Sequence, residues 1–264
     1  MGFWSSVVGI IGVIAAPFTG GASLLLTAAA VVAPKVVDAV KAKLGMPNLK
    51  VQYTIVTPTN RIPLVQNGTI DLECSTTTNT TARGQQVDFA PTHFVSSITA
   101  AVKKSSGLNS MSQLDGKSVA TVAGSTSIQL LRVYRKNEQV QFNEVSGKDI
   151  SETFLMLSSG RAVAMILDDV QLAGLIATST NANDYKLFDE RLREEPYGFM
   201  MRKDDPAFKA VVDETLTRIM KSGEINEIYA KWFVKPVPPN NVSLNFPMSS
   251  VLKETYKNPN NKGI

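Results

Sequence analysis

The chain alternates predicted strands with predicted helices, and this alternation limits what it can fold into. The first series has a helical pattern at residues 36–45 ending at Gly45, strands at 49–56 and 70–74, and a short helix at 58–68. Strands joined in this order by short links form parallel sheets covered by helices, because a helix must return the chain to start the next strand. The pattern therefore predicts an α/β fold.

A second series follows a polar linker at residues 104–114. It predicts strands at 117–123, 140–145, 162–167, 185–188 and 197–203, and helices at 128–137, 150–159, 206–222, 224–233 and 249–256. Residues 162–167 read AVAMIL, a run typical of a strand buried on both faces. Two series separated by a linker predict two lobes.

Residues 1–34 contain no charged side chain. Two apolar runs, at residues 7–16 and 22–33, flank a Pro-Gly segment at 17–21, and each is shorter than the roughly 20 residues that span a bilayer. No basic stretch precedes the first run, as it would in an ordinary secretory signal. Three interpretations stay open: a buried strand, turn and helix start; a membrane-associated hairpin; or an atypical export signal.

Composition excludes several function classes. The net charge is +4 and the basic residues are scattered, so we expect no nucleic-acid partner. Cys74 is the only cysteine and His93 the only histidine, which leaves no intrachain disulfide and no zinc site of familiar spacing. No GxSxG motif accompanies His93, so we expect this histidine to be structural. The sequence predicts neither a metal nor another cofactor.

Polar clusters follow three predicted strands, at residues 75–83, at 124–127 and at Asp168. Ligands of open α/β sheets bind beyond the carboxyl ends of the strands, so the clusters predict a cleft between the lobes. In the first cluster, Thr and Asn are residues that favour a helix N-terminus, where an anion can bind. Arg83 can form a bidentate hydrogen bond with a carboxylate. A solvated loop is the alternative, and glycosylation sequons begin at Asn67 and Asn79.

The other two clusters differ in the charge of the ligand group that each could bind. Residues 124–127 read GSTS, a second helix start that could bind an anion or simply cap its helix. Asp168 ends a buried strand and needs a cationic partner, which could be a ligand ammonium or a nearby Lys or Arg. Together the three clusters describe a pocket for a zwitterion, and hence for an amino acid.

Five stretches in unchanged order carry a family resemblance: NRIPLVQNGTIDLECSTTTNTTAR (60–83), LDGKSVATVAGSTS (114–127), SSGRAVAMILDD (158–169), EPYGFMMRKDDPAF (195–208) and KWFVKPVPPNNVSLNF (231–246). The chain resembles extracytoplasmic (periplasmic) solute-binding proteins of polar amino acid ABC transporters, nearest to the glutamate/aspartate-binding members. The resemblance implies the two-lobe periplasmic-binding-protein fold, type II-like, in which the lobes close around the ligand by a hinge motion.

The resemblance also implies a division of the chain and a set of ligand contacts. The first lobe would comprise 35–97 and 198–264, the second lobe would comprise 98–197, and an atypical apolar segment would occupy 1–34; the crossings would lie near 94–103 and 194–202. Arg83 would bind the α-carboxylate and Asp168 the α-ammonium. The remaining contacts would be Thr76 and Thr77 from the first lobe and Ser125, Thr126 and Ser127 from the second.

Two departures bear on selectivity. The arginine that glutamate binders use near their first strand is absent from the uncharged residues 7–34, and Ile150 stands where they have a histidine. Both changes weaken the expectation of an acidic ligand.

We therefore expect a periplasmic, monomeric, non-enzymatic protein that captures an amino acid and delivers it to the membrane permease subunits of an ABC transporter. One alternative is an enzyme similar to cyclohexadienyl dehydratases, with Glu73 or Asp168 as the acid or base. The other is a membrane-associated sensory binding module, suggested by the uncharged start of the chain.

Overall fold

The computed structural model describes residues 10–13, 23–236 and 243–264. The predicted turn at residues 17–21 and the uncharged residues 1–9 lie outside this part. The strands are β1 Ile10–Val13, β2 Lys50–Tyr53, β3 Leu72–Glu73, β4 Asp88–Phe89, β5 Phe94–Lys103, β6 Ser118–Val122, β7 Asn143–Gly147, β8 Ala164–Asp168, β9 Tyr185–Leu187, β10 Glu194–Tyr197 and β11 Met200–Met201. The helices are α1 Ser23–Leu44, α2 Arg61–Gln66, α3 Thr81–Gly84, α4 Thr126–Glu138, α5 Ile150–Ser158, α6 Asp169–Thr178, α7 Pro206–Lys221, α8 Glu224–Tyr229 and α9 Ser250–Lys257.

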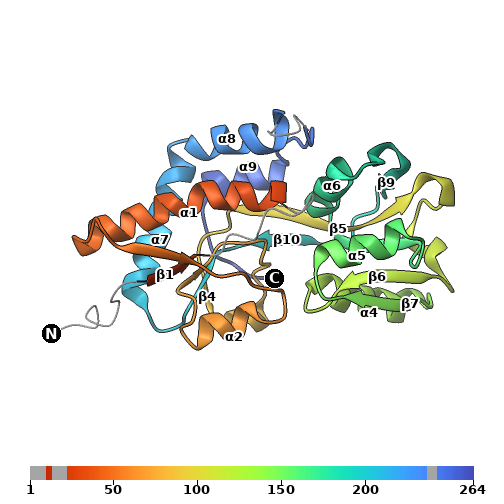
Figure 1. Cartoon of the computed structure of the whole chain (residues 1–264), viewed down its shortest axis with the longest axis horizontal. Helices are drawn as coiled ribbons and strands as arrows, with labels where there is room; N and C mark the ends of the chain where they lie inside the picture. The colour runs from red at the N-terminus through yellow and green to blue at the C-terminus, as the bar shows by residue number, and fades with distance from the viewer. Residues whose placement is uncertain (1–9, 14–22, 237–242) are drawn as a thin grey trace.

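These elements form two sheets, each with its own helices (Figure 1). The first has the strand order β2-β1-β3-β11-β4, and with its helices we call it lobe 1. The second has the order β10-β5-β8-β6-β7, with β9 also paired to β5, and we call it lobe 2. The predicted two-lobe α/β fold is confirmed.

The sheets are mixed rather than purely parallel, which corrects the prediction of parallel sheets. β1 runs parallel to β2 and β3, and β6 runs parallel to β7 and β8. β11 is antiparallel to β3 and β4, and β5 is antiparallel to β8. The antiparallel strands are those that carry the chain between lobes, and a chain that enters and leaves a lobe along neighbouring strands runs in opposite directions.

The connection between the lobes is an antiparallel pair. β5 spans the predicted crossing at residues 94–103, and its first half pairs with β10, with Phe94 opposite Tyr197 and Ser97 opposite Glu194. The second predicted crossing, at 194–202, divides into β10 and β11, with Gly198 between them. The expected single strand at 197–203 is therefore wrong.

The start of the chain joins lobe 1 through backbone pairing. β1 lies between β2 and β3, and α1 begins at Ser23, well before the predicted helix at 36–45. This arrangement agrees with the strand-and-helix interpretation of the uncharged segment 1–34 over the part described. Among the described residues, no helix is both long and apolar enough to cross a membrane.

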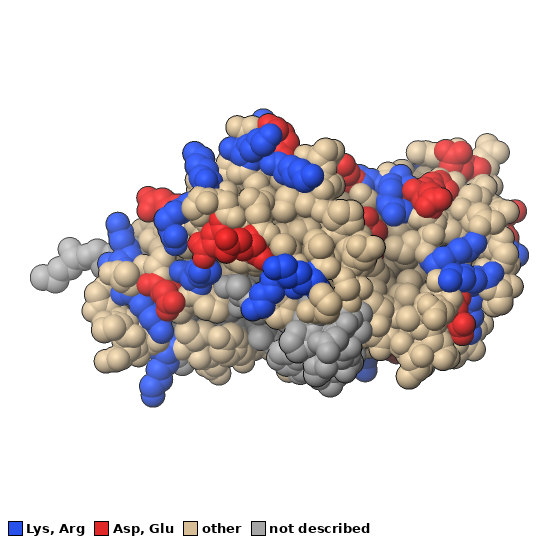
Figure 2. Space-filling view, turned by 90° about the horizontal axis from the view of Figure 1, so that it is seen from above, with Lys and Arg blue, Asp and Glu red and all other residues tan. Residues whose placement is uncertain are grey.

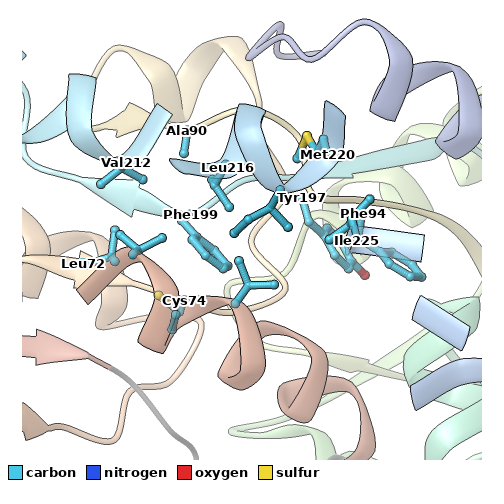
Figure 3. Packing of buried hydrophobic residues seen from close by; sticks show 14 of the residues in the cluster. Leu72, Cys74, Ala90, Phe94, Tyr197, Phe199, Val212, Leu216, Met220 and Ile225 are labelled. Atoms are coloured by element: carbon cyan, nitrogen blue, oxygen red, sulfur yellow. The ribbon is translucent and has the colours of Figure 1, made fainter. Parts of the chain in front are cut away.

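The core of lobe 1 forms where α1 and α7 pack against the sheet. Figure 3 shows Leu72, Phe199, Val212 and Leu216 converging between strand and helix, and each is fully buried. Lobe 2 buries apolar residues on both faces of β8, all of which is buried. The apolar run at 162–167 is explained by this double burial.

Charged side chains on the face shown in Figure 2 are interspersed in sign, with lysines and arginines lying among aspartates and glutamates. No continuous basic stripe crosses that face. The scattered basic residues of the sequence thus remain scattered on this surface.

Candidate functional site

Arg83 lies where the two lobes meet. It belongs to α3, whose N-cap residue Thr80 accepts a hydrogen bond from the Arg83 amide at 3.2 Å. Its guanidinium donates to the Thr78 carbonyl at 2.9 Å and to the Gly124 carbonyl of lobe 2 at 3.3 Å. Burial and the neighbouring Arg61 lower the pKa of Arg83 to about 10, so it stays positively charged at neutral pH. The positively charged guanidinium of Arg83 therefore joins the two lobes by hydrogen bonds to both.

The start of α4 faces Arg83 from lobe 2. Ser125 is the N-cap residue, and the hydroxyls of Ser125 and Ser127 are buried without a hydrogen-bond partner among the described residues. Thr126 donates to Glu195 at 2.8 Å, so its hydroxyl is already engaged. Gly124 has a φ of +77°, and a Cβ there would lie 3.0 Å from the Pro58 backbone, so the two lobes touch closely here.

Asp168 provides the negative charge. It ends β8, occupies the N-cap position of α6 without a capping hydrogen bond from its side chain, and is 5% exposed. Gln171 donates to one carboxylate oxygen at 3.4 Å, and the other oxygen has no partner among the described residues. Burial and the nearby Glu195 carboxylate raise the pKa of Asp168 to about 7. A cation placed beside it would restore the ionised form.

The following residue, Asp169, is hydrogen-bonded to the crossing strand β5. It accepts hydrogen bonds from the Ser96 hydroxyl at 2.6 Å and the Ser97 amide at 3.1 Å, and it pairs with Arg191 at 3.5 Å. The two neighbouring carboxylates thus have different environments: within the described part of the chain Asp169 is fully engaged, whereas Asp168 keeps one oxygen without a partner.

Arg61 was missed by the sequence analysis. It opens α2, is 7% exposed, and its Nη1 lies 3.8 Å from Glu73 Oε1. Its Nε has no hydrogen-bond partner among the described residues, and burial lowers its pKa despite the nearby Glu73 and Asp168. The available signal was a charged residue inside the apolar helix RIPLVQ.

Glu73 forms a buried cluster behind Arg61. It is fully buried at the end of β3 and accepts a hydrogen bond from Thr77 at 2.8 Å. Burial raises the pKa of Glu73, whereas the Arg61 charge and the Thr77 hydrogen bond act in the opposite direction. The Thr77 hydrogen bond therefore stabilises the ionised form of Glu73.

A small cavity of about 30 Å³ lies between the lobes. Its lining includes Arg61, Thr76 and Thr78 from lobe 1 and Ser125, Thr126, Asp168 and Gln171 from lobe 2, together with the apolar Pro58, Val122, Ile150 and Leu167. Arg83 binds the carbonyl of a lining residue, Thr78, and the carbonyl next to Ser125. One cation, Arg61, and one carboxylate, Asp168, therefore line this space, and a second cation, Arg83, lies beside it, which suits a ligand carrying both charges.

The predicted site residues fall into two groups. Thr76, Ser125, Thr126 and Asp168 line the cavity, and Arg83 lies at its edge. Thr77 and Ser127 are fully buried and absent from the lining, while Thr78, which was not predicted, lies in it. The Thr77 hydroxyl instead donates to the buried Glu73 carboxylate.

Other residues singled out by the sequence lie elsewhere. His93 packs against Phe199 with ring centroids 4.4 Å apart, and burial lowers its pKa to about 3, which fits a structural role. Cys74 is buried in the core of lobe 1. Asn79 is 4% exposed, so its side chain is inaccessible for glycosylation in the folded protein. Among the described residues, no group of three or more His, Cys, Asp or Glu could hold a metal ion.

Known proteins share much of this sequence, including the part that forms the cleft. The family model described as bacterial extracellular solute-binding proteins, family 3, matches residues 32–235. The L-glutamate/L-aspartate-binding protein of Pseudomonas aeruginosa is 46% identical over 228 residues, which cover 86% of this chain and 76% of the relative. The glutamate/aspartate import solute-binding protein of Escherichia coli K12 is 39% identical over 229 residues, covering 87% and 76%.

Among solved structures, an ancestral arginine-binding protein bound to arginine is similar, with a TM-score of 0.68 and 28% identity. The match covers 85% of this chain and 97% of that structure. All the residues that line the cavity fall inside the segment matched by the family model.

Proposed function

The chain belongs to family 3 of the bacterial extracellular solute-binding proteins, and we propose that it captures glutamate or aspartate and delivers it to the permease of an ABC transporter. One observation carries the choice of an acidic ligand: lobe 1 brings Arg61 and Arg83 to the cavity, and lobe 2 brings Asp168. An acidic amino acid has two carboxylates and one ammonium, so two arginines and one aspartate toward the cavity suit its charges, while Glu73 stays paired with Arg61 behind the cavity.

Each charge has a role in this proposal. Arg83 binds the α-carboxylate, with the Ser125 hydroxyl and the start of α4 as further donors. Asp168 accepts the α-ammonium. Arg61 faces the side-chain carboxylate and replaces the arginine that is missing near the first strand. Thr76 and Thr78 line the lobe 1 wall, while Thr77 acts indirectly, by donating to Glu73.

Ligand entry requires the lobes to separate. The cavity of about 30 Å³ is far smaller than the roughly 300 Å³ or more of a typical small-molecule pocket. Arg83 and Gly124 hold the lobes together across the cleft, and a bound carboxylate would replace the Gly124 carbonyl as the partner of Arg83. Closure on the ligand is the hinged motion that binding proteins use. We place the lobe boundaries near positions 97 and 197, where the crossing strands run.

The chain is a solute-binding protein and not an enzyme, in line with its family and relatives. The dehydratase alternative required Glu73 or Asp168 as an acid or base. Glu73 is fully buried behind Arg61, and Asp168 has the position of an ammonium acceptor. We propose further that the chain works outside the cytoplasm as a monomer; the sensory-module alternative would depend on the uncharged segment 1–34.

A thermal-shift screen over the common amino acids tests the ligand assignment. A ligand at 100 times its Kd stabilises the folded state by about 2.7 kcal/mol, which raises Tm by roughly 5–10 °C for a chain of this size. We expect glutamate and aspartate to give the largest shifts. A larger shift with arginine, or with a neutral amino acid, would contradict the proposed selectivity.

Arg61→Met is expected to remove the preference for an acidic side chain. Loss of one partner of a buried charge pair costs about 2–4 kcal/mol, so glutamate affinity should fall by about 30- to 1,000-fold, whereas glutamine should lose less than about tenfold. Calorimetry with both amino acids measures this ratio. Arg218→Met on α7, an exposed arginine, is the matched control. An unchanged glutamate-to-glutamine ratio would remove Arg61 from the ligand site.

A further inference from the structure

Residues 258–264 follow α9 and run back along the segment that carries Arg83. The Thr92 amide donates to the Asn260 carbonyl at 2.8 Å, and the Asn261 side chain donates to the Phe89 carbonyl at 3.3 Å. In Figure 1 the end of the chain lies near the middle of the molecule, beside the junction of the lobes. The tail therefore lies against lobe 1 close to the cleft.

The last residues pair with the backbone immediately before α3. The Ile264 amide donates to the Asn79 carbonyl at 3.1 Å, and the Thr81 amide donates to the Ile264 carbonyl at 2.8 Å. The Asn79 side chain donates to the Asn261 carbonyl at 2.8 Å. On its other side the Asn79 amide donates to the Pro196 carbonyl of β10 at 2.8 Å. This segment is thus held between the tail and a crossing strand.

The tail follows a well-packed helix, although its own residues 260–264 are exposed on their outer side. Leu252 and Tyr256 of α9 are 1% and 5% exposed, and the Tyr256 hydroxyl donates to the His93 carbonyl at 2.9 Å. At Gly263 a Cβ would lie 2.8 Å from Asn79 Oδ1 and 3.1 Å from the Thr80 carbonyl carbon. Only glycine fits there without moving the Thr80 backbone, and Thr80 is the residue that caps the Arg83 amide.

We propose that residues 259–264 form a positioning strap that holds residues 79–81, and through them Arg83, in the geometry required for ligand binding. The ligand part of this inference rests on the proposed function. The physical reason is preorganisation: a binding group that is already fixed loses less conformational entropy when the ligand arrives. Without the strap, the Asn79 carbonyl and the Thr81 amide lose their partners, and the short helix α3 loses its support on one side.

The test uses Gly263→Val in the full chain, with exposed Lys262→Ala as the neighbouring control. In the ligand-free protein we expect amide exchange at residues 79–84 to become at least about tenfold faster, with β6 and β8 unchanged. Glutamate affinity should fall by about tenfold. Gly263→Ala should give smaller effects, and removal of residues 259–264 should match or exceed those of Gly263→Val.

A double-mutant cycle with Arg83→Ala separates positioning from general damage. If the strap acts through Arg83, Gly263→Val should weaken glutamate binding little further once Arg83 is gone; additive losses would mean that it does not act through Arg83. Unchanged exchange at residues 79–84 would overturn the strap itself. If the unaltered chain binds no amino acid, the proposed function fails, and the exchange measurement alone decides the strap.

Discussion

Replacing Arg83 with alanine is expected to weaken glutamate binding by about 30- to 5,000-fold, the equivalent of about 2–5 kcal/mol. The expected loss is large because, in the proposed complex, Arg83 supplies the cation for a carboxylate that is buried when the lobes close. Among the described residues, no second arginine donates to both the Thr78 and the Gly124 carbonyl. Calorimetry with glutamate measures the change. Arg83→Lys keeps the charge but not the planar two-pronged donor, so its affinity should be intermediate.

Arg161→Ala is the control for this prediction, because Arg161 is an exposed arginine on lobe 2. Thermal unfolding should show that both variants fold. Glutamate affinity in Arg83→Ala within about threefold of the unaltered chain would remove Arg83 from the ligand site, since loss of one partner of a buried, hydrogen-bonded charge pair costs about 2–5 kcal/mol.

Glutamate binding is expected to release close to one proton at pH 6 and almost none at pH 8. In the ligand-free protein, burial and Glu195 raise the pKa of Asp168 to about 7, so at pH 6 its carboxyl is mostly protonated. The ligand ammonium favours the carboxylate, and the proton leaves. Affinity should therefore rise between about pH 5 and 7 and level off above that. Calorimetry in buffers with different ionisation enthalpies counts the released protons.

The same shift has a consequence for stability, and its sign is opposite to that of a salt-bridged carboxylate. A folded pKa above the unfolded value means that the folded state binds more protons, so the ligand-free protein loses stability as pH rises from about 4 to 7, by on the order of 2–4 kcal/mol. Asp168→Asn should abolish both the proton release and this loss, and should bind glutamate poorly at pH 8. Proton release that persists in Asp168→Asn would assign it to another group, such as Glu73.

Much of the fold and part of the site could be predicted from local patterns. The apolar run at 162–167 predicted a strand buried on both faces, and β8 is one. Small polar residues after strands predicted helix starts, and Thr80 and Ser125 are N-cap residues. These predictions succeed because helix caps and strand periodicity depend on residues within a few positions of each other. Arg83 and Asp168 were proposed from the same kind of local pattern, and the structure places Asp168 in the cavity lining and Arg83 beside it.

The features that the sequence analysis did not predict depend on how distant parts of the chain pack together. The sequence analysis assigned no role to Arg61, but β3 brings Glu73 to within 3.8 Å of it and the fold leaves it only 7% exposed. The expected parallel sheets became mixed because the chain crosses between lobes twice. Thr78, which the resemblance did not suggest, lines the cavity with Thr76, whereas Thr77 does not, because the packing of this loop decides which side chains face the cleft.

The sequence by itself determined the α/β class, the two lobes and the family, and it led to the proposal of a zwitterion pocket, because these follow from local periodicity and from short motifs in a fixed order along the chain. Tertiary structure alone decided that Arg61 joins the cleft, that Arg83 reaches Gly124, and that the tail pairs with Asn79 and Thr81. The Arg83–Gly124 hydrogen bond joins residues 41 positions apart, and Asn79–Asn261 joins residues 182 positions apart. Contacts over such separations form only when the whole chain has packed, so no local pattern encodes them.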